Sequence, residues 1–374
     1  MSNGLRLCAQ CVHGIGLLVF CFSLTPASRL LDAPNRWSMK SLTWLAMLFA
    51  FGFSCAQAGE VPGSGINAVP EAKRVKTILQ QPESSMDLAV VKLTIDKMIE
   101  PSIDINANLK KIDGIVAQIL EMAGSNPSSN AKLLALKRYM YEKGPWNNNE
   151  PYQYDFADPR GTKISNKLLP TYLATKKGNC VSMPFLFVVL GQRLGLDVSA
   201  STAPEHYFVK YTDPDVGITY NLETTSGANP TRDMWYRQEM PMTDEAIANG
   251  IYLQALTKRE TAALMATILA ENFAERREPE KIIAIVDAVL PFYPNNIGLI
   301  LGKGSAYSRL IKRDFVAKYL RPADIPAAEV PYFRFLAEQN RLWFAKAESL
   351  GWQQPSMVQE VRYQEIVNRA KSSR

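Results

Sequence analysis

The stretch Gly178-Asn179-Cys180-Val181-Ser182-Met183-Pro184 opens an apolar segment that runs to Leu194-Gly195-Leu196. This composition predicts a buried helix with Cys180 at its N-terminus and Pro184 in the first turn, where a missing N–H is tolerated. The positive end of the helix dipole favours a thiolate, and Gly178 lets the backbone approach a substrate closely. The backbone N–H of Cys180 could also face an oxyanion. Cys180 is therefore a candidate nucleophile.

Two later runs supply the other groups that a cysteine nucleophile needs. His206 begins the alternating run Tyr207-Phe208-Val209-Lys210-Tyr211, which is typical of a strand, and a histidine there could act as the base. The run Tyr220-Asn221-Leu222-Glu223-Thr224-Thr225 predicts the next strand. Asn221 and Glu223 are two residues apart and share one face, so either could orient the far nitrogen of His206.

Other interpretations of these residues are simpler. A lone cysteine is most often a small buried hydrophobe, and a lone histidine is most often structural. A Ser182–His206 pair lacks the Gly-x-Ser-x-Gly elbow that exposes a nucleophilic serine. One cysteine and one histidine cannot complete a zinc site without two carboxylates, and no glycine-rich phosphate loop is present. We therefore expect no metal and no cofactor.

Taken together, three runs resemble the bacterial transglutaminase-like superfamily: Lys177-Gly178-Asn179-Cys180, Ala203-Pro204-Glu205-His206-Tyr207-Phe208-Val209 and Leu222-Glu223-Thr224-Thr225. The likeness covers most of residues 85–300, from a helical lead-in around Asp87-Leu88-Ala89 and Asp104-Ile105 to tetratricopeptide-like helices downstream. It is similar to the branch of bacterial proteins that joins this core to a helical tail.

The resemblance implies an α+β fold with a papain-like core. Such a core has a helical lead-in, a cysteine at a helix start and an antiparallel sheet that carries the histidine and the acid. Cys180 would be the nucleophile, His206 the base, and an acid on the following strand would orient the base. The family usually has Asp before a Pro-Thr-like pair, which Glu223 matches better than Asn221. Members of this branch often lack the cysteine and are presumed to be binding proteins, whereas this chain keeps it.

The first 58 residues have a composition of their own. Met39-Lys40 precedes an apolar run from Ser41 to Phe53, which is followed by Ala56-Gln57-Ala58. A basic start, an apolar run too short to cross a bilayer comfortably and an A-x-A ending are typical of a cleavable secretory signal. We expect translation to start at Met39 and cleavage after Ala58, although the apolar run from Gly14 to Phe22 could make a second anchor.

A lipoprotein signal at Cys55 is disfavoured because Gly52-Phe53-Ser54 is a poor aliphatic lead-in. The mature chain is expected to be periplasmic or secreted, with no stable membrane span. Of the five cysteines, only Cys180 would then remain, so no internal disulfide could form.

The totals exclude several classes of protein. With 47% hydrophobic and 21% charged residues, the 374-residue chain has an ordinary globular composition. The net charge of +6 is not gathered into a Lys/Arg block, so we expect no nucleic-acid partner.

The chain divides into five predicted parts: an upstream segment and signal peptide (1–58), a flexible leader (59–83), a transglutaminase-like domain (84–255), a tetratricopeptide-like helical region (256–350) and a tail (351–374). Ser84-Ser85, Asp104, and either Ser129 or Asn130 predict helix starts in the lead-in. The aromatic loop 146–161 could line a groove or be pinned to the core, and residues 233–250 look irregular. Thr257 and Glu260 form a capping box, and further helices are expected at 280–290, 297–311 and 330–350.

The leading hypothesis is an exported transglutaminase-like cysteine enzyme that acts on amide bonds through a thioester, by peptide hydrolysis, deamidation or acyl transfer. Its substrate would be a protein or peptide, with cell-wall peptide a plausible example, and the C-terminal helices could hold a protein partner. The alternative is a non-catalytic binding or scaffold protein of the cell envelope that uses the groove and the helical tail. A redox-sensing thiol is a third interpretation.

Overall fold

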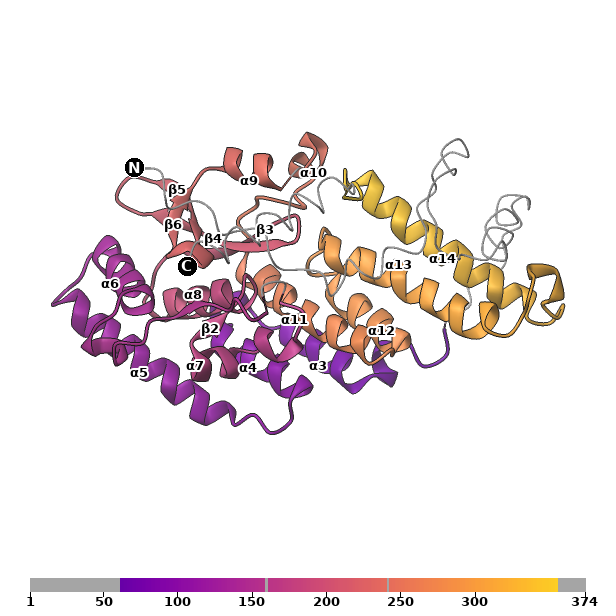
Figure 1. Cartoon of the computed structure of the whole chain (residues 1–374), viewed down its shortest axis with the longest axis horizontal. Helices are drawn as coiled ribbons and strands as arrows, with labels where there is room; N and C mark the ends of the chain where they lie inside the picture. Colours follow the sequence, from indigo (N-terminus) through magenta and orange to yellow (C-terminus); the bar gives the residue numbers. More distant parts are fainter. Residues whose placement is uncertain (1–60, 159–160, 241, 356–374) are drawn as a thin grey trace.

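The computed structural model describes residues 61–158, 161–240 and 242–355. The predictions of a start at Met39, a signal peptide and cleavage after Ala58 lie outside these residues, as does most of the 351–374 tail. Figure 1 shows an elongated molecule with the antiparallel sheet at one end and the last helices at the other. Within the described ranges, no helix is both long and apolar enough to cross a membrane.

Among the described residues, four helices and two short 3-10 turns come first along the chain. They are η2 (Ile66–Ala68), α3 (Pro70–Leu79), η3 (Glu83–Ser85), α4 (Leu88–Ile99), α5 (Ile105–Ala123) and α6 (Ser129–Tyr141). The side chains of Asp87, Asp104 and Ser128 accept backbone N–H groups in the first turns of α4, α5 and α6. Such caps satisfy donors that a helix leaves open, so they fix where each helix begins.

The segment predicted as a flexible leader contains α3, and here the structure differs from the prediction. α3 buries Ala72, Val75, Ile78 and Leu79 and packs against α12, far along the chain. The glycine- and proline-rich residues before it resemble a leader, but the helix itself is held by this distant apolar contact. Ser84 and Ser85 lie in η3, and Asp87 takes the capping role that was expected of them.

The next elements along the chain are η4 (Pro145–Asn147), β1 (Gln153–Tyr154), η5 (Ile164–Lys167), α7 (Leu169–Thr175), β2 (Lys177–Gly178) and α8 (Ser182–Arg193). β1 and β2 pair in parallel. Every residue of α8 from Ser182 to Gly191 is buried. A helix that is apolar on all sides lies at the centre of a fold, as expected of the helix that follows Cys180.

The four-stranded antiparallel sheet has the order β3-β4-β5-β6. Its strands are β3 (Val198–Ala203), β4 (His206–Asp213), β5 (Ile218–Glu223) and β6 (Asn229–Thr231), with η6 (Thr224–Ser226) after β5. As the alternation in β4 predicts, Val209 and Tyr211 join the main hydrophobic cluster, whereas Phe208 joins a separate cluster with Tyr236.

We predicted that residues 233–250 would be irregular, and this prediction is wrong. They form α9 (Asp233–Glu239) and α10 (Asp244–Ala248). The fully buried Tyr236 of α9 stacks on Phe208 with ring centroids 4.2 Å apart. α9 is too short for a helical period to show in the sequence, and this contact with the sheet holds it.

The C-terminal helices are α11 (Lys258–Glu275), α12 (Pro279–Val289), α13 (Ile297–Ile311) and α14 (Val330–Ser349), with η7 (Lys312–Val316) and η8 (Pro322–Asp324) between the last two. The capping box of Thr257 and Glu260 starts α11 as predicted. α11 packs on α4 of the lead-in, and one hydrophobic cluster includes residues of both regions. The tetratricopeptide-like character of these helices stays a prediction.

Candidate active site

Asn179 holds the start of α8. Its side-chain Oδ1 accepts the backbone N–H groups of Val181 at 3.0 Å and Ser182 at 3.1 Å. Its own backbone N–H donates to Oγ of Ser182 at 3.1 Å. This reciprocal capping fixes Cys180 at the junction between β2 and α8. It also gives the Ser182 hydroxyl a structural task at the helix start.

Position 178 must be glycine because the Tyr172 ring occupies the space where a side chain would lie. A Cβ atom added to Gly178 would lie 2.5 Å from the Tyr172 ring and 2.8 Å from Oγ of Ser182. Its carbonyl oxygen accepts the backbone N–H of Asp155 at 2.7 Å. We expected the absent side chain of Gly178 to let a substrate approach the backbone, but on this side the Tyr172 ring takes the space.

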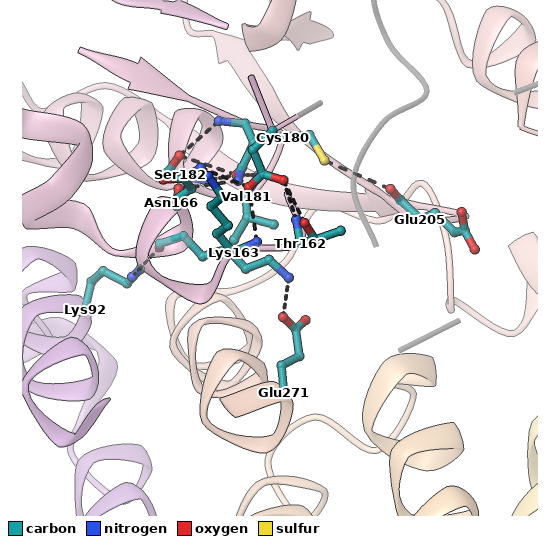
Figure 2. Close-up of polar contacts among 12 residues, drawn as sticks. Lys92, Thr162, Lys163, Asn166, Cys180, Val181, Ser182, Glu205 and Glu271 are labelled. Carbon is teal, nitrogen blue, oxygen red and sulfur yellow. Dashed lines mark hydrogen bonds and ion pairs between the residues drawn. The ribbon is translucent and has the colours of Figure 1, made fainter. Parts of the chain in front are cut away.

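The thiol lies beside the turn that leads to the candidate base. Sγ of Cys180 is 4.0 Å from the carbonyl oxygen of Glu205, the residue before His206 (Figure 2). Glu205 adopts a left-handed conformation with φ of 56°, in the two-residue turn between the paired Ala203 and His206. The Cys180 side chain is buried, with 1% of its surface exposed.

His206 and Glu223 form a buried pair. Nε2 of His206 lies 2.9 Å from Oε2 of Glu223, and the same oxygen accepts the hydroxyl of Tyr236 at 2.9 Å. The other oxygen, Oε1, accepts the backbone N–H of Thr225 at 3.0 Å and its hydroxyl at 2.8 Å. A carboxylate can only accept, so Nε2 carries the proton and Nδ1 is the basic nitrogen of the neutral ring.

Asn221 has different partners. Its Oδ1 accepts from Nζ of Lys210 at 2.6 Å, and its Nδ2 donates to Oδ1 of Asp233 at 2.6 Å. Asn221 lies directly opposite Lys210 in the register of β4 and β5. Glu223 is two residues farther along β5, toward the end where β4 begins with His206. The structure therefore brings Glu223 to the histidine and leaves Asn221 on Lys210.

A hydrogen-bonded loop that includes Asp158, Thr162, Lys163 and Asn166 holds the side chain of Asn179. The carboxylate of Asp158 accepts from Thr162 N at 2.8 Å, Thr162 Oγ1 at 2.9 Å, Lys163 N at 3.1 Å and Asn166 Nδ2 at 2.9 Å. The carbonyl oxygen of Asn166 then accepts from Nδ2 of Asn179 at 3.3 Å. Burial by itself would raise the pKa of Asp158, but these hydrogen bonds hold that pKa below its usual value.

Lys167, at the end of this loop, is connected to two helices that are distant in sequence by buried charged side chains. Lys92 and Asp96 of α4 form an ion pair, and Nζ of Lys92 also donates to the carbonyl oxygen of Lys167 at 3.0 Å. The ammonium group of Lys167 pairs with Glu271 of α11. Figure 2 shows Lys92 and Glu271 reaching the loop from separate helices. Burial lowers the pKa of Lys92 and raises that of Asp96, and their attraction opposes both shifts.

Sequence reasoning missed these supporting residues. The signal that could have indicated the loop is Asp158-Pro159-Arg160-Gly161, a pattern in which an aspartate caps a turn. Lys92, Lys167 and Glu271 give no such signal, because a charged residue in a helix reads as a solvated one. Within residues 61–158, 161–240 and 242–355, no group of His, Cys, Asp and Glu side chains is arranged to hold a metal ion.

Comparison with known proteins shows which family part of this chain is similar to. Residues 106–265 match the family model described as "Transglutaminase-like superfamily", a range that includes Cys180, His206 and Glu223. A "UPF0162 protein" from Xylella fastidiosa (strain Temecula1 / ATCC 700964) is 23% identical over 216 residues, which cover 55% of this chain and 73% of that protein. No solved structure matches the chain.

Proposed function

We propose that this protein transfers acyl groups through a thioester, because residues 106–265 match the model of the transglutaminase-like superfamily, a class that often has cysteine-based enzyme activity. Sγ of Cys180 attacks the carbonyl carbon of an amide, and Nδ1 of His206 takes the thiol proton. As the C–N bond breaks, His206 returns the proton to the leaving amine. Water or a second amine then attacks the thioester, which gives hydrolysis, deamidation or transfer.

The observation that carries this proposal is the contact between Glu223 and His206. Glu223 accepts hydrogen bonds from His206 Nε2, from the Tyr236 hydroxyl, and from the backbone and side chain of Thr225. Glu223 is therefore fixed, and it holds the tautomer that presents Nδ1 as a base. In catalytic triads the third group holds the imidazole in the correct tautomer and orientation, and Glu223 is placed to do the same here.

The position of Cys180 supports the same role. It precedes α8, whose N-terminus favours a negatively charged sulfur. Sγ also lies against the turn that ends at His206, at 4.0 Å from the Glu205 carbonyl oxygen. Cys180 directly precedes a buried helix and His206 begins a strand, so rigid elements hold both residues.

The test is the pH dependence of alkylation by iodoacetamide, followed on the peptide that contains Cys180. The expected result is reaction well below about pH 8.5, the pKa of a free thiol, and loss of that reactivity in His206→Ala. Glu223→Gln should weaken it, since an amide cannot stabilise the imidazolium. Asn221→Ala is the matched control on the same strand face and should keep the wild-type profile. A thiol indifferent to both His206 and Glu223 would refute the proposal.

A second candidate function is favoured by one observation. Cys180 and His206 are each only 1% exposed, as expected of residues that support a closed binding or scaffold protein. In that case the protein would hold an envelope partner without turnover, and Cys180→Ala would leave partner binding intact. The alkylation profile distinguishes the two functions, because a scaffold needs no activated thiol.

We further propose that the protein is exported and acts on a protein or peptide of the cell envelope. The support is the sequence pattern from Met39 to Ala58, together with the single cysteine that would follow cleavage. N-terminal sequencing of the natural protein tests it. A mature chain beginning at Gly59 is the expected result, and a chain that keeps residues 39–58 would count against export by this route.

A further inference from the structure

A groove away from Cys180 has the features of a ligand site. It has a volume of about 300 Å³ and lies between α5, the end of α6, η4 and α7, helices that gather at the same end of the molecule as the sheet (Figure 1). The residues that line it include Lys111, Gly114, Tyr139, Trp146, Tyr152 and Lys176. None of them belongs to the site described above.

Two phenol groups line this groove. Tyr139 is 8% exposed and Tyr152 is 4% exposed, so most of each ring is packed inside the protein. A phenol on the wall of a groove can donate its hydroxyl proton to a bound anion. Burial raises the pKa of both tyrosines, which therefore stay protonated and able to donate.

Gly114 leaves an open space in the wall of the groove. It lies inside α5, where glycine is less favourable than alanine by about 0.5–1 kcal/mol. A Cβ atom added there would meet no atom within 4 Å. Packing inside the protein therefore does not require glycine at this position, and its effect is to widen the groove.

The charge of the lining is positive. Lys111 and Lys176 contribute ammonium groups, and no acidic side chain lines the groove. Lys176 is fixed, because its Nζ donates to the carbonyl oxygens of Asn147 at 2.8 Å and Glu150 at 2.9 Å. Its backbone has a φ of 55°, a conformation that glycine usually takes after a helix. The Glu150 carboxylate lies 3.7 Å from Nζ, but it is 75% exposed and directed to solvent.

An apolar wall completes the groove. Trp146 contributes its indole, which is held from one side by the Arg138 guanidinium at 4.3 Å and by a hydrogen bond from its Nε1 to the carbonyl oxygen of Arg138 at 3.3 Å. Leu173 and Ile115 also line the groove. A ring fixed by two contacts keeps its position when the site is empty, which lowers the entropy cost of binding.

We propose that this groove binds a small organic anion with an apolar or aromatic body. The anionic head, a carboxylate or a phosphate, lies between Lys111 and the hydroxyls of Tyr139 and Tyr152. The body packs against Trp146 and occupies the space beside Gly114. Such a ligand accepts hydrogen bonds from the two phenols, is attracted to Lys111, and fills the space that the absent side chain of Gly114 leaves open.

The test uses 8-anilinonaphthalene-1-sulfonate, an aromatic anion whose fluorescence rises on binding, with the whole protein. Gly114→Leu should fill the groove and Lys111→Glu should repel the anion, and each should weaken binding by about tenfold or more, the effect of losing one charge-assisted contact. The matched controls lie on the same helix outside the lining: Ala117→Leu and Lys110→Glu should bind the probe like the wild type. Circular dichroism checks that all four variants fold.

Competition then identifies the head group. Phenylacetate and phenyl phosphate should both displace the probe, and the stronger competitor shows whether the groove prefers a carboxylate or a phosphate head group. Benzyl alcohol, which keeps the ring without the charge, should displace it poorly. The proposal is wrong if the probe binds Gly114→Leu and Lys111→Glu as it binds the wild type, or if the neutral alcohol competes as well as the anions.

Discussion

At the scale of single residues, Glu223 depends on Tyr236 for its position. The Tyr236 hydroxyl donates to the same carboxylate oxygen that His206 contacts, and Tyr236 is fully buried. A hydrogen bond to a charged group is worth about 1.5–3 kcal/mol. We expect Tyr236→Phe to lower the free energy of unfolding by about that amount in urea denaturation, and to slow Cys180 alkylation. Tyr220→Phe, at an exposed tyrosine of β5, should change neither, and an equal effect of the two variants would contradict this assignment.

Asp158 makes the stability of the loop depend on pH. Because its pKa is lowered in the folded protein, the carboxylate stabilises the fold above the unfolded pKa of about 3.9 and loses this effect as the pH falls through the folded value. Asp158→Asn should therefore be less stable than the wild type near neutral pH, and the difference should shrink in acid. Urea denaturation of both proteins at several pH values measures it. A constant difference would mean that the charge has no part.

Asn221 and Glu223 show what one strand cannot reveal. Their spacing places both on one face of β5, so the sequence left two candidates to hold His206. The choice depends on the register with β4, where Asn221 lies opposite Lys210. Register is set by the pairing of two strands and by the turn between them, and neither strand contains it alone.

At the scale of elements, α5 carries a glycine that weakens it. Gly114 has helical neighbours on both sides and open space where its Cβ would be. Gly114→Ala should therefore raise the free energy of unfolding by about 0.5–1 kcal/mol, because alanine has a lower entropy cost in a helix. Thermal or urea denaturation of the two proteins tests this. A destabilised variant would mean that the backbone at Gly114 is strained or more closely packed than the structure indicates.

Elements whose limits are encoded locally could be predicted. α13 covers Ile297–Ile311 as expected, with Asn296 capping it, and α11 starts at the Thr257 capping box. α3 and α9 could not be predicted in this way. Each is short and is stabilised by a distant partner, α12 for α3 and the sheet for α9. Helices whose starts are marked by capping residues can therefore be predicted from the sequence. Helices that are stabilised by packing against a distant element cannot.

At the scale of the whole molecule, the pair of Lys167 and Glu271 joins the loop under Asn179 to the C-terminal helices. Both residues are nearly fully buried. Removing one partner of a buried ion pair typically costs about 3–5 kcal/mol. Glu271→Gln and Lys167→Met should each destabilise the protein by this order.

The double variant Lys167→Met, Glu271→Gln is the control for that prediction. It removes both charges together, so its cost should be clearly less than the sum of the two single costs, as a double-mutant cycle in urea would show. Additive losses would mean that the two side chains do not depend on each other.

The same ion pair sets an order of events on the ribosome. Glu271 lies 104 positions after Lys167, so the ion pair between them cannot form until Glu271 has been synthesised. Cys180 and His206 are made well before that point, so the segment that carries the thiol cannot reach its final support while α11 is still inside the exit tunnel. In arrested nascent chains, Cys180 should therefore change its reactivity toward alkylating reagents only after α11 has emerged. A newly made chain would therefore complete the support beneath Cys180 only after α11 has reached the loop.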